Sequence, residues 1–358
     1  SVDPANGSIQ KLYAEDTNLN IFQESKVSKA LIDKNAIYSA EGSKTITTSE
    51  NVIGQIVPYA GEFGISKNPE SFAVYGYRKY FTDVDRSVVL RLSGDGLTEI
   101  SNYGMKEFFR TKLAQTNSTS KVIGGWDMHN KVYVSSIQLN TGNYNTLTWD
   151  EGVSGWVSRY SYKPEQFFSI KNNVFSIANG SIWSHYSEGV SRGSFYDSAV
   201  TPASVKFVIN DNPSTQKVFS TLSYEGSNGW EVTSIVGSAQ GGQGQPGLNV
   251  GTTYSDIAAP ILSYLKGAYD NTGATGVAAI QRPIFHAGFD IKENKYVASI
   301  VKGAKTENIP GQVIVGSGQL GIKGYYAEVE IKTDNLTDLG GIKELFAVQA
   351  TFTAANGY

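Results

Sequence analysis

The sequence of 358 residues contains no cysteine, which excludes disulfide bonds, thiolate nucleophiles and cysteine-ligated zinc. Histidine is scarce as well. The three histidines, His129, His185 and His286, form neither an HExxH nor a His-x-His pattern. No Gly-x-Ser-x-Gly elbow is present, although a Ser-His-Asp triad assembled from distant residues stays open at this point. We therefore predict no catalytic residue, no metal site and no cofactor.

Long apolar runs and a strong net charge are also missing. No apolar run approaches the ~20 residues of a membrane-spanning helix, so we expect no membrane span. The net charge of −3 argues against a specific nucleic-acid site, because nucleic-acid binders carry a basic patch. The stretch GGQGQPG (241–247) lacks the Lys-Ser/Thr ending of a P-loop. The first residues, SVDPANGSIQ, have no initiator Met and no signal-peptide profile, so we expect a piece of a longer chain or a processed product.

The residues that are abundant favour β structure. Aromatic residues make up 12% of the chain, with 21 tyrosines, and there are 38 glycines, a composition typical of strands and tight turns. The segment NKVYVSSIQLN (130–140) alternates apolar and small polar residues, as a half-buried strand does. Residues 167–186 read as three short strands, with hairpin turns at Asn172-Asn173 and Asn179-Gly180. Residues 323–333 and 343–353 are expected to form an antiparallel pair.

Helices are expected in only two places. Residues 102–115 have apolar side chains at a helical spacing. Residues 254–271 are a second candidate, with Ser255 as a cap and Pro260 near the middle as a break. Because the neighbouring Gly/Gln-rich residues cannot pack a core, we expect residues 238–283 to be a flexible, partly helical insertion in a β scaffold.

Two internal repeats predict the architecture. GWDMHNKVYVSSI begins at Gly125 and GFDIKENKYVASI begins at Gly288, and EGVSGW (151–156) recurs as EGSNGW (225–230). Self-similarity in an all-β chain favours a repetitive array such as a propeller. We therefore predict an all-β, propeller-like domain of antiparallel blades over residues 1–358. Pairing of residues 11–22 with 343–352 would close the ring and remove its exposed edges.

The acidic residues allow two further interpretations. Asp83, Asp85 and Asp95 lie in turns and are read as turn formers, with calcium binding as the alternative. Asp150-Glu151 adjoins Trp149 and Trp156, and Glu225 precedes Trp230, an arrangement that a polysaccharide hydrolase would need. Because Glu-Gly-x-x-Gly-Trp is repeated, we favour an architectural role in which Trp156 and Trp230 belong to the core.

Four longer segments resemble large virion structural proteins of tailed bacteriophages. They are YGYRKYFTDVDRSVVLRLSGDGLTEISNYGMKEFFR, GWVSRYSYKPEQFFSIKNNVFSIANGSIWSHY, INDNPSTQKVFSTLSYEGSNGW and GIKGYYAEVEIKTDNLTDLGGIKELFAVQATFT. This group includes the muzzle-type proteins of crAss-like phage tails and structural proteins of marine phages. The resemblance implies a non-enzymatic virion protein of the tail that forms the C-terminal part of a longer polypeptide. As partners we expect other tail subunits, in a homo-oligomeric ring. A module that binds host-surface glycan, and a tail-associated hydrolase, are kept as alternatives.

Overall fold

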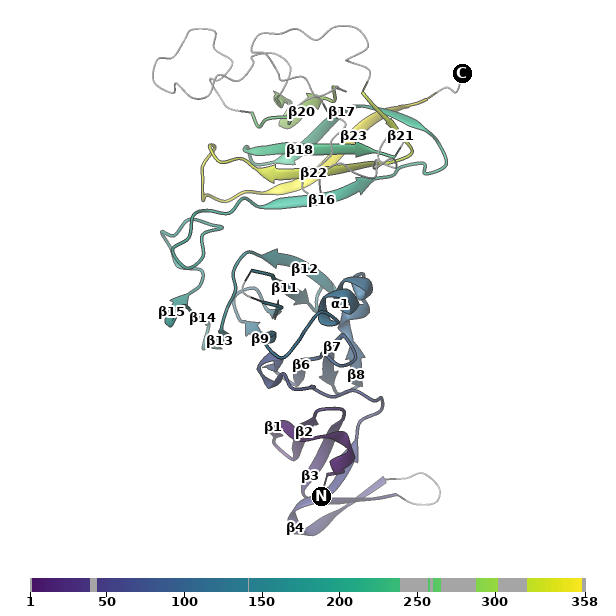
Figure 1. Cartoon of the computed structure of the whole chain (residues 1–358), viewed down its shortest axis with the longest axis vertical. Coiled ribbons are helices and arrows are strands. Elements are labelled where there is room, and N and C mark those ends of the chain that lie inside the picture. Colours follow the sequence, from purple (N-terminus) through teal and green to yellow (C-terminus); the bar gives the residue numbers. More distant parts are fainter. Residues whose placement is uncertain are drawn as a thin grey trace. The chain divides into compact units, whose positions relative to one another are not determined.

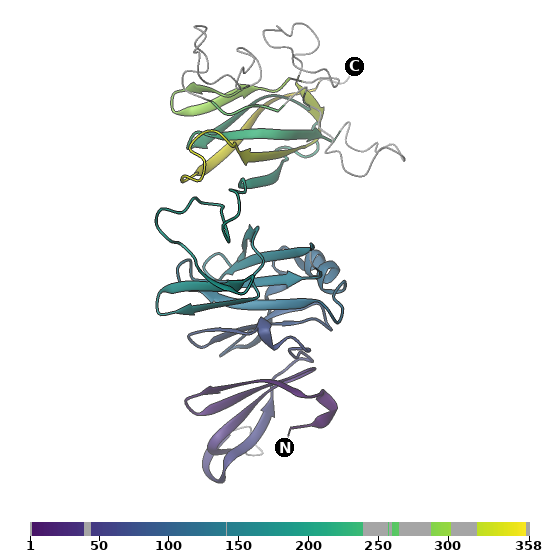
Figure 2. The same ribbon diagram turned by 60° about the vertical axis from the view of Figure 1, so that its left-hand side comes forward.

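The computed structural model describes residues 2–38, 44–140, 142–238, 257, 260–264, 288–301 and 321–355. For residues 33–38 and 44–51 it describes the backbone alone. Figures 1 and 2 show that these residues are mostly strands. The chain divides into two compact units, Ser1–Gly189 and Val190–Tyr358. The sequence predicted a single domain over residues 1–358, whereas the described residues form two units with separate hydrophobic cores.

The first unit contains four antiparallel sheets, each built from strands that follow one another in the chain (Figure 1). The first two are β1 (Ile9–Glu15), β2 (Asn18–Gln23), β3 (Val27–Tyr38) and β4 (Lys44–Pro58), then β5 (Ala73–Tyr75), β6 (Arg78–Asp83), β7 (Val88–Ser93) and β8 (Gly96–Glu99). The other two are β9 (Lys121–Asp127), β10 (Val132–Gln138), β11 (Tyr144–Asp150) and β12 (Gly155–Tyr160), then β13 (Gln166–Ile170), β14 (Asn173–Ala178) and β15 (Ser181–Ser184). Short local connections of this kind favour hairpins and meanders.

Aromatic side chains fill the cores of the first unit. Phe22 of β2 packs edge-on against Phe81 of β6, which joins the first two sheets. Tyr80 stacks between Trp126 and Tyr133, which joins the second and third sheets. Aromatic rings supply much apolar area per residue, and their contacts add stabilisation beyond the area that they bury.

The helical elements of the first unit are short. The helix predicted within residues 102–115 is confirmed as α1 (Lys106–Leu113), which buries Phe109 and Leu113. Three 3-10 turns are η1 (Pro4–Asn6), η2 (Pro69–Ser71) and η3 (Ile100–Asn102). No helix in the described part of the chain has the length and apolar character that a membrane crossing needs.

The second unit is a sandwich of two sheets with one core between them. One sheet has the order β16 (Ser204–Ile209), β22 (Ala327–Thr333), β18 (Trp230–Gly237). The other has the order β19 (Asp290–Lys292), β20 (Lys295–Ser299), β17 (Lys217–Gly226), β21 (Ile322–Gly324), and β23 (Leu345–Ala354) also pairs with β17. Alternate residues of β22 (Ala327, Val329 and Ile331) are buried in this core, as expected for a strand with one covered face.

The all-β prediction with antiparallel sheets is confirmed, but two predicted strand pairings are wrong. Residues 323–333 pair through β22 with β16 and β18, and residues 343–353 pair through β23 with β17. Residues 11–22 belong to β1 and β2, which pair with each other, so the expected pairing with 343–352 is not formed. Two neighbouring strand segments suggest a local hairpin, but the composition of a strand does not identify a partner that lies far away in the sequence. The described strands show no closed propeller or barrel.

The first repeat is a hairpin in both copies. Residues 125–137 turn from β9 into β10, and residues 288–300 turn from β19 into β20. The second repeat differs between its copies. EGVSGW joins β11 to β12 within one sheet, whereas EGSNGW leads from β17 in one sheet of the sandwich to β18 in the other. The shared pattern Glu-Gly-x-x-Gly-Trp therefore forms a hairpin turn in one unit and a connection between two sheets in the other.

The predicted insertion at 238–283 lies largely outside the described residues. Within it, Ile261 forms a bridge with Val232 of β18, and Leu262 forms one with Gly288. Ile257 and Ile261 are buried in the core of the second unit. The prediction of a helix over 254–271 is therefore wrong at residues 260–264, where Pro260 precedes extended backbone.

Candidate functional site

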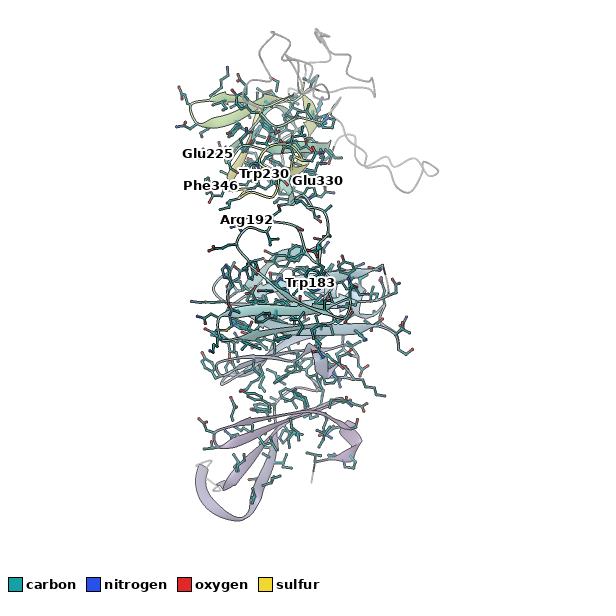
Figure 3. The ribbon with its side chains drawn as sticks, turned by 90° about the vertical axis from the view of Figure 1, so that its left-hand side faces the viewer. Trp183, Arg192, Glu225, Trp230, Glu330 and Phe346 are labelled. Carbon is teal, nitrogen blue, oxygen red and sulfur yellow. The ribbon has the colours of Figure 1, made fainter. Side chains whose placement is uncertain are left out.

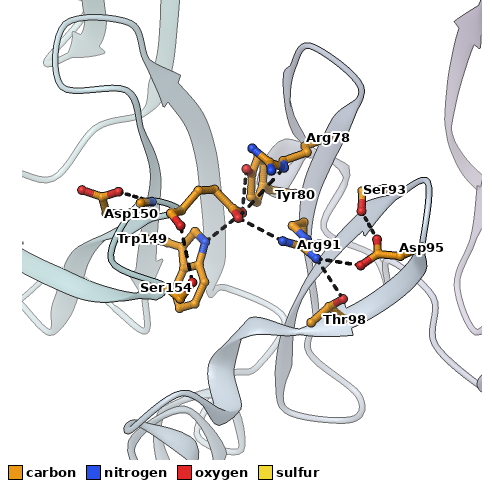
Figure 4. A network of polar contacts seen from close by, with 11 residues as sticks. Arg78, Tyr80, Arg91, Ser93, Asp95, Thr98, Trp149, Asp150 and Ser154 are labelled. Carbon is orange, nitrogen blue, oxygen red and sulfur yellow. Dashed lines mark hydrogen bonds and ion pairs between the residues drawn. The ribbon is translucent and has the colours of Figure 1, made fainter.

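The carboxylate of Glu151 is the centre of a polar network in the first unit (Figure 4). It accepts hydrogen bonds of 2.9 Å from the hydroxyl of Tyr80, the indole N–H of Trp149 and the guanidinium of Arg91. Its side chain is only 14% exposed. Because three donors occupy this carboxylate, Glu151 is a structural acceptor that connects the turn after β11 to β6 and β7.

The acids considered for a hydrolase are therefore engaged in structure. Asp150 accepts a hydrogen bond of 2.7 Å from the backbone N–H of Gly152 in the same turn. Glu225 forms an ion pair of 2.6 Å with Lys295 on the surface of the second unit. Glycoside hydrolysis needs two carboxylates that face each other across a groove. The contacts of Asp150 and Glu225 are instead with a turn amide and a surface lysine.

The two repeated tryptophans have the predicted architectural role. Trp230 is buried in the core of the second unit, and Trp156 packs on a core cluster of the first. Each donates its indole N–H to a backbone carbonyl at 3.0 Å, Trp156 to Ile100 and Trp230 to Glu344. Trp230 is labelled in Figure 3. A buried indole needs such a partner, so the repeat encodes a tryptophan anchor.

The three aspartates do not form one calcium site. Asp83 is buried, and its carboxylate accepts hydrogen bonds of 2.9 Å from the Gly64 N–H and the Ser66 hydroxyl, together with contacts from Arg86. Asp85 lies in the same turn, whereas Asp95 lies in the turn at the other end of β7 and contacts Arg91. A strand of this length separates its ends by roughly 17 Å, too far for one cation. The turn-forming interpretation holds, and the calcium alternative is wrong for this trio.

Two of the histidines lie beside Asp127. Asp127 is buried and accepts hydrogen bonds from the backbone N–H groups of His129 (2.8 Å) and Asn130 (3.0 Å) and from the hydroxyl of Tyr186. The imidazole of His129 stacks on the Tyr186 ring, with centroids 4.1 Å apart and planes at 12°. Tyr186 is exposed, so this pair presents a flat surface to solvent.

His185 contacts a serine, but the pair is not arranged for nucleophilic catalysis. The Nε2 atom of His185 lies 2.7 Å from the hydroxyl of Ser176. Ser176 is completely buried on β14, and the imidazole itself packs against the rings of Tyr162 and Phe167, so a substrate cannot reach the Ser176 oxygen. Burial lowers the pKa of His185 below its usual value, although the charge of Asp127 opposes the shift. His286 lies outside the described residues.

The outer face of the sheet β13-β14-β15 is the best candidate for an interaction surface. Register places eight positions on this face, and none of them is charged. Five are apolar, and we call them the apolar face: Phe168, Ile170, Phe175, Ile177 and Ile182. Ile170 and Ile182 are 58% and 68% exposed. The opposite face buries Phe167 and Val174, so the sheet is apolar on both sides, which is unusual for a surface that faces water.

The second unit has exposed apolar side chains near the start of β23. Leu336, Leu339 and Ile342 lie in the connection between β22 and β23, and Phe346 lies on β23 (Figure 3). Phe346 is 72% exposed, the largest exposure among these four. Large apolar side chains of this kind mark contact surfaces more often than catalytic ones.

The comparison with protein families finds a match in the second unit. Residues 190–302 match the family model of the Crassvirus muzzle protein C-terminal domain. The predicted resemblance to muzzle-type structural proteins of crAss-like phages is thus confirmed for this part of the chain, and the match indicates a location in the virion tail. It begins at the residue where the second compact unit begins. No curated protein matches the chain.

The apolar face was not predicted from the sequence, although the residue pattern of its strands indicates it. The strand prediction for residues 167–186 identified three strands and their turns. Within them, apolar residues stand in adjacent pairs, Phe167-Phe168 and Val174-Phe175, so that both faces of the sheet receive apolar side chains. Adjacent apolar pairs in short strands indicate a sheet with two covered faces.

Proposed function

We propose that the chain is a non-enzymatic structural component at the distal end of a phage tail, where it contacts neighbouring tail subunits in a homo-oligomeric ring. The match of residues 190–302 to the muzzle protein domain carries this proposal. The apolar face supports it, because an uncharged sheet surface gains free energy when another protein covers it, at roughly 25 cal/mol per Å² of apolar area.

The apolar face can be tested with a matched pair of variants. Ile182 on the apolar face and Val153 in the turn between β11 and β12 are both 68% exposed. Association of the chain is measured by sedimentation. We expect Ile182→Lys to weaken association and Val153→Lys to leave it unchanged. Equal behaviour of the two variants would remove the apolar face from the proposal, and a chain that stays monomeric within the tail would contradict the ring.

Glycan binding is the second candidate function, and one observation favours it. The exposed stack of His129 and Tyr186 lies next to Asn130, whose side-chain nitrogen donates to the Tyr186 hydroxyl at 2.7 Å. A flat ring with polar neighbours is a common platform for sugars. A glycan array combined with a reducing-sugar assay tests this function. Glycan binding that is lost in Tyr186→Ala would support this function. Release of reducing sugar would instead show that the chain is an enzyme.

A further inference from the structure

The carboxylate of Glu15 bridges two nitrogen-bearing side chains from different strands. Its Oε1 atom contacts the Nζ of Lys79, and its Oε2 atom accepts a hydrogen bond of 2.9 Å from the Nδ2 of Asn20. Glu15 is the last residue of β1, Asn20 lies on β2 and Lys79 lies on β6 in the next sheet. An amine and a carboxamide are thus held on the two oxygens of a single acid.

The amine and the carboxamide lie in a buried, aromatic environment. The Lys79 side chain is 5% exposed, and Asn20 is fully buried. The ring of Tyr13 lies 5.7 Å from Nζ. Lysine is rarely buried, so an amine held against an acid at this depth is unusual. Water, which would compete as a nucleophile, is largely excluded.

A hydroxyl also contacts the carbonyl oxygen of the carboxamide. Tyr59 donates a hydrogen bond of 3.1 Å to the Oδ1 of Asn20. Burial, with a smaller contribution from the charge of Glu15, raises the pKa of Tyr59 to about 12, so the hydroxyl keeps its proton. A fixed donor on a carbonyl oxygen stabilises the negative charge that develops when a nucleophile attacks the carbon.

From this geometry we propose that Lys79 and Asn20 form an intramolecular amide cross-link, with Glu15 as the proton carrier. Glu15 takes a proton from the Lys79 ammonium, and the free Nζ attacks the Cγ of Asn20. The C–N bond forms, negative charge collects on Oδ1 beside Tyr59, and Glu15 moves a proton from Nζ to Nδ2. The bond from Cγ to Nδ2 then breaks, and ammonia leaves with the remaining proton as ammonium. Glu15 ends as a carboxylate, and no oxidant or energy source is needed.

The link can form only after the first proton transfer, from Lys79 to Glu15. Burial acts to raise the pKa of Glu15, but the hydrogen bonds from Lys79 and Asn20 outweigh it, and the net shift is downward. Glu15 is therefore a carboxylate at rest, and it holds the proton from Lys79 only transiently. We expect the link to form slowly after folding, on a timescale that mass spectrometry of freshly folded protein can follow.

The mass of the full chain tests the proposal directly. Purified wild-type protein is expected to be lighter than its sequence by one ammonia, and a tryptic digest is expected to contain a branched peptide that joins Asn20 to Lys79. The branched peptide distinguishes the link from ammonia loss at Asn-Gly sites. A wild-type mass equal to that of the sequence, with only linear peptides at both residues, would overturn the proposal.

Variants assign the roles. Lys79→Arg and Glu15→Gln are expected to restore the full mass, and both are expected to melt at a lower temperature than the linked protein. Lys26→Arg is the matched control, since Lys26 also forms an ion pair, with Glu62, and no carboxamide of the described residues contacts that acid. It is expected to keep the link. A linked Glu15→Gln protein would exclude Glu15 as the proton carrier.

Discussion

Tyr80 and Glu151, from different sheets of the first unit, are joined by a hydrogen bond of 2.9 Å from the phenol to the carboxylate. Burial raises the pKa of Tyr80 well above its usual range, and the negative charge of Glu151 adds to the shift. The phenol is therefore a permanent donor. The contact secures the turn after β11 against β6, and its removal has a measurable cost.

Tyr80→Phe is expected to lower the free energy of unfolding by about 1–2 kcal/mol, because one hydrogen bond to a charged acceptor is lost. Glu151→Leu is expected to cost more, about 3–5 kcal/mol, since it also leaves the Arg91 guanidinium without its closest acid. Urea unfolding measures both values. Glu107→Gln, on the exposed surface of α1, is the control and should change stability by less than about 0.5 kcal/mol. Equal costs for all three would contradict the assigned role.

Gly124→Ala is expected to destabilise the first unit by about 3 kcal/mol or more, because an added Cβ overpacks the interior. The Cβ would lie 1.9 Å from the backbone oxygen of Ser71, and neither backbone can move freely. Gly94→Ala is the matched control, since its Cβ would meet nothing within 4 Å. Thermal unfolding compares the two variants. A similar melting temperature for both would show that β9 does not approach η2 this closely.

Stability is expected to fall as the pH drops below about 7, in part because of His185. Burial lowers the pKa of His185 below 6.5 in the folded chain. In the unfolded chain its pKa is about 6.5, so below that pH the unfolded state binds a proton that the folded state resists. The loss continues until the pH reaches the folded pKa, with a slope of at most about 1.4 kcal/mol per pH unit.

His185→Gln is expected to flatten this part of the pH profile. The free energy of unfolding is measured in urea at several values between pH 5 and 8. The slope decides the outcome, because the substitution can also shift the absolute stability. An unchanged slope in His185→Gln would show that another group is responsible.

Trp230→Phe is expected to lower the free energy of unfolding of the second unit by about 1–3 kcal/mol, because the carbonyl of Glu344 loses one of its donors and the core loses volume. Trp156→Phe removes the equivalent bond to Ile100 in the first unit. Since Trp156 is only partly buried, its loss is expected to cost less. Tryptophan fluorescence during unfolding reports both changes, and the reverse order would contradict the shared role of the repeated hexapeptide.

Local features could be predicted from the sequence because local geometry determines them. The Asn179-Gly180 turn was predicted from residue type, and both residues have positive φ, 53° and 71°. The preceding turn is displaced by one position, to Lys171-Asn172, with Lys171 at φ 54°. Three consecutive polar residues allow either register, and the packing of Phe167 and Val174 on the core selects the observed one.

Non-local pairing could not be predicted for a physical reason. β22 pairs with β16 on one side and β18 on the other, and β16 precedes it by more than a hundred residues. β22 alternates apolar and charged residues, a pattern that fits any strand with one covered face, so its sequence does not identify a partner. The acids next to tryptophans could be found in the sequence, but only the three donors on Glu151 show that its carboxylate is occupied.

The central position of β17 has a consequence for synthesis. β17 pairs with β20 and β21 along one edge and with β23 along the other, and the register joins Lys217 to Ala354. The ribosome must therefore release residue 354 before this sheet is complete. The sheets of the first unit need only neighbouring strands and can form while translation continues. During that interval the unpaired edge of β17 is the part of the nascent chain most exposed to aggregation, and a chaperone that acts late would protect it best.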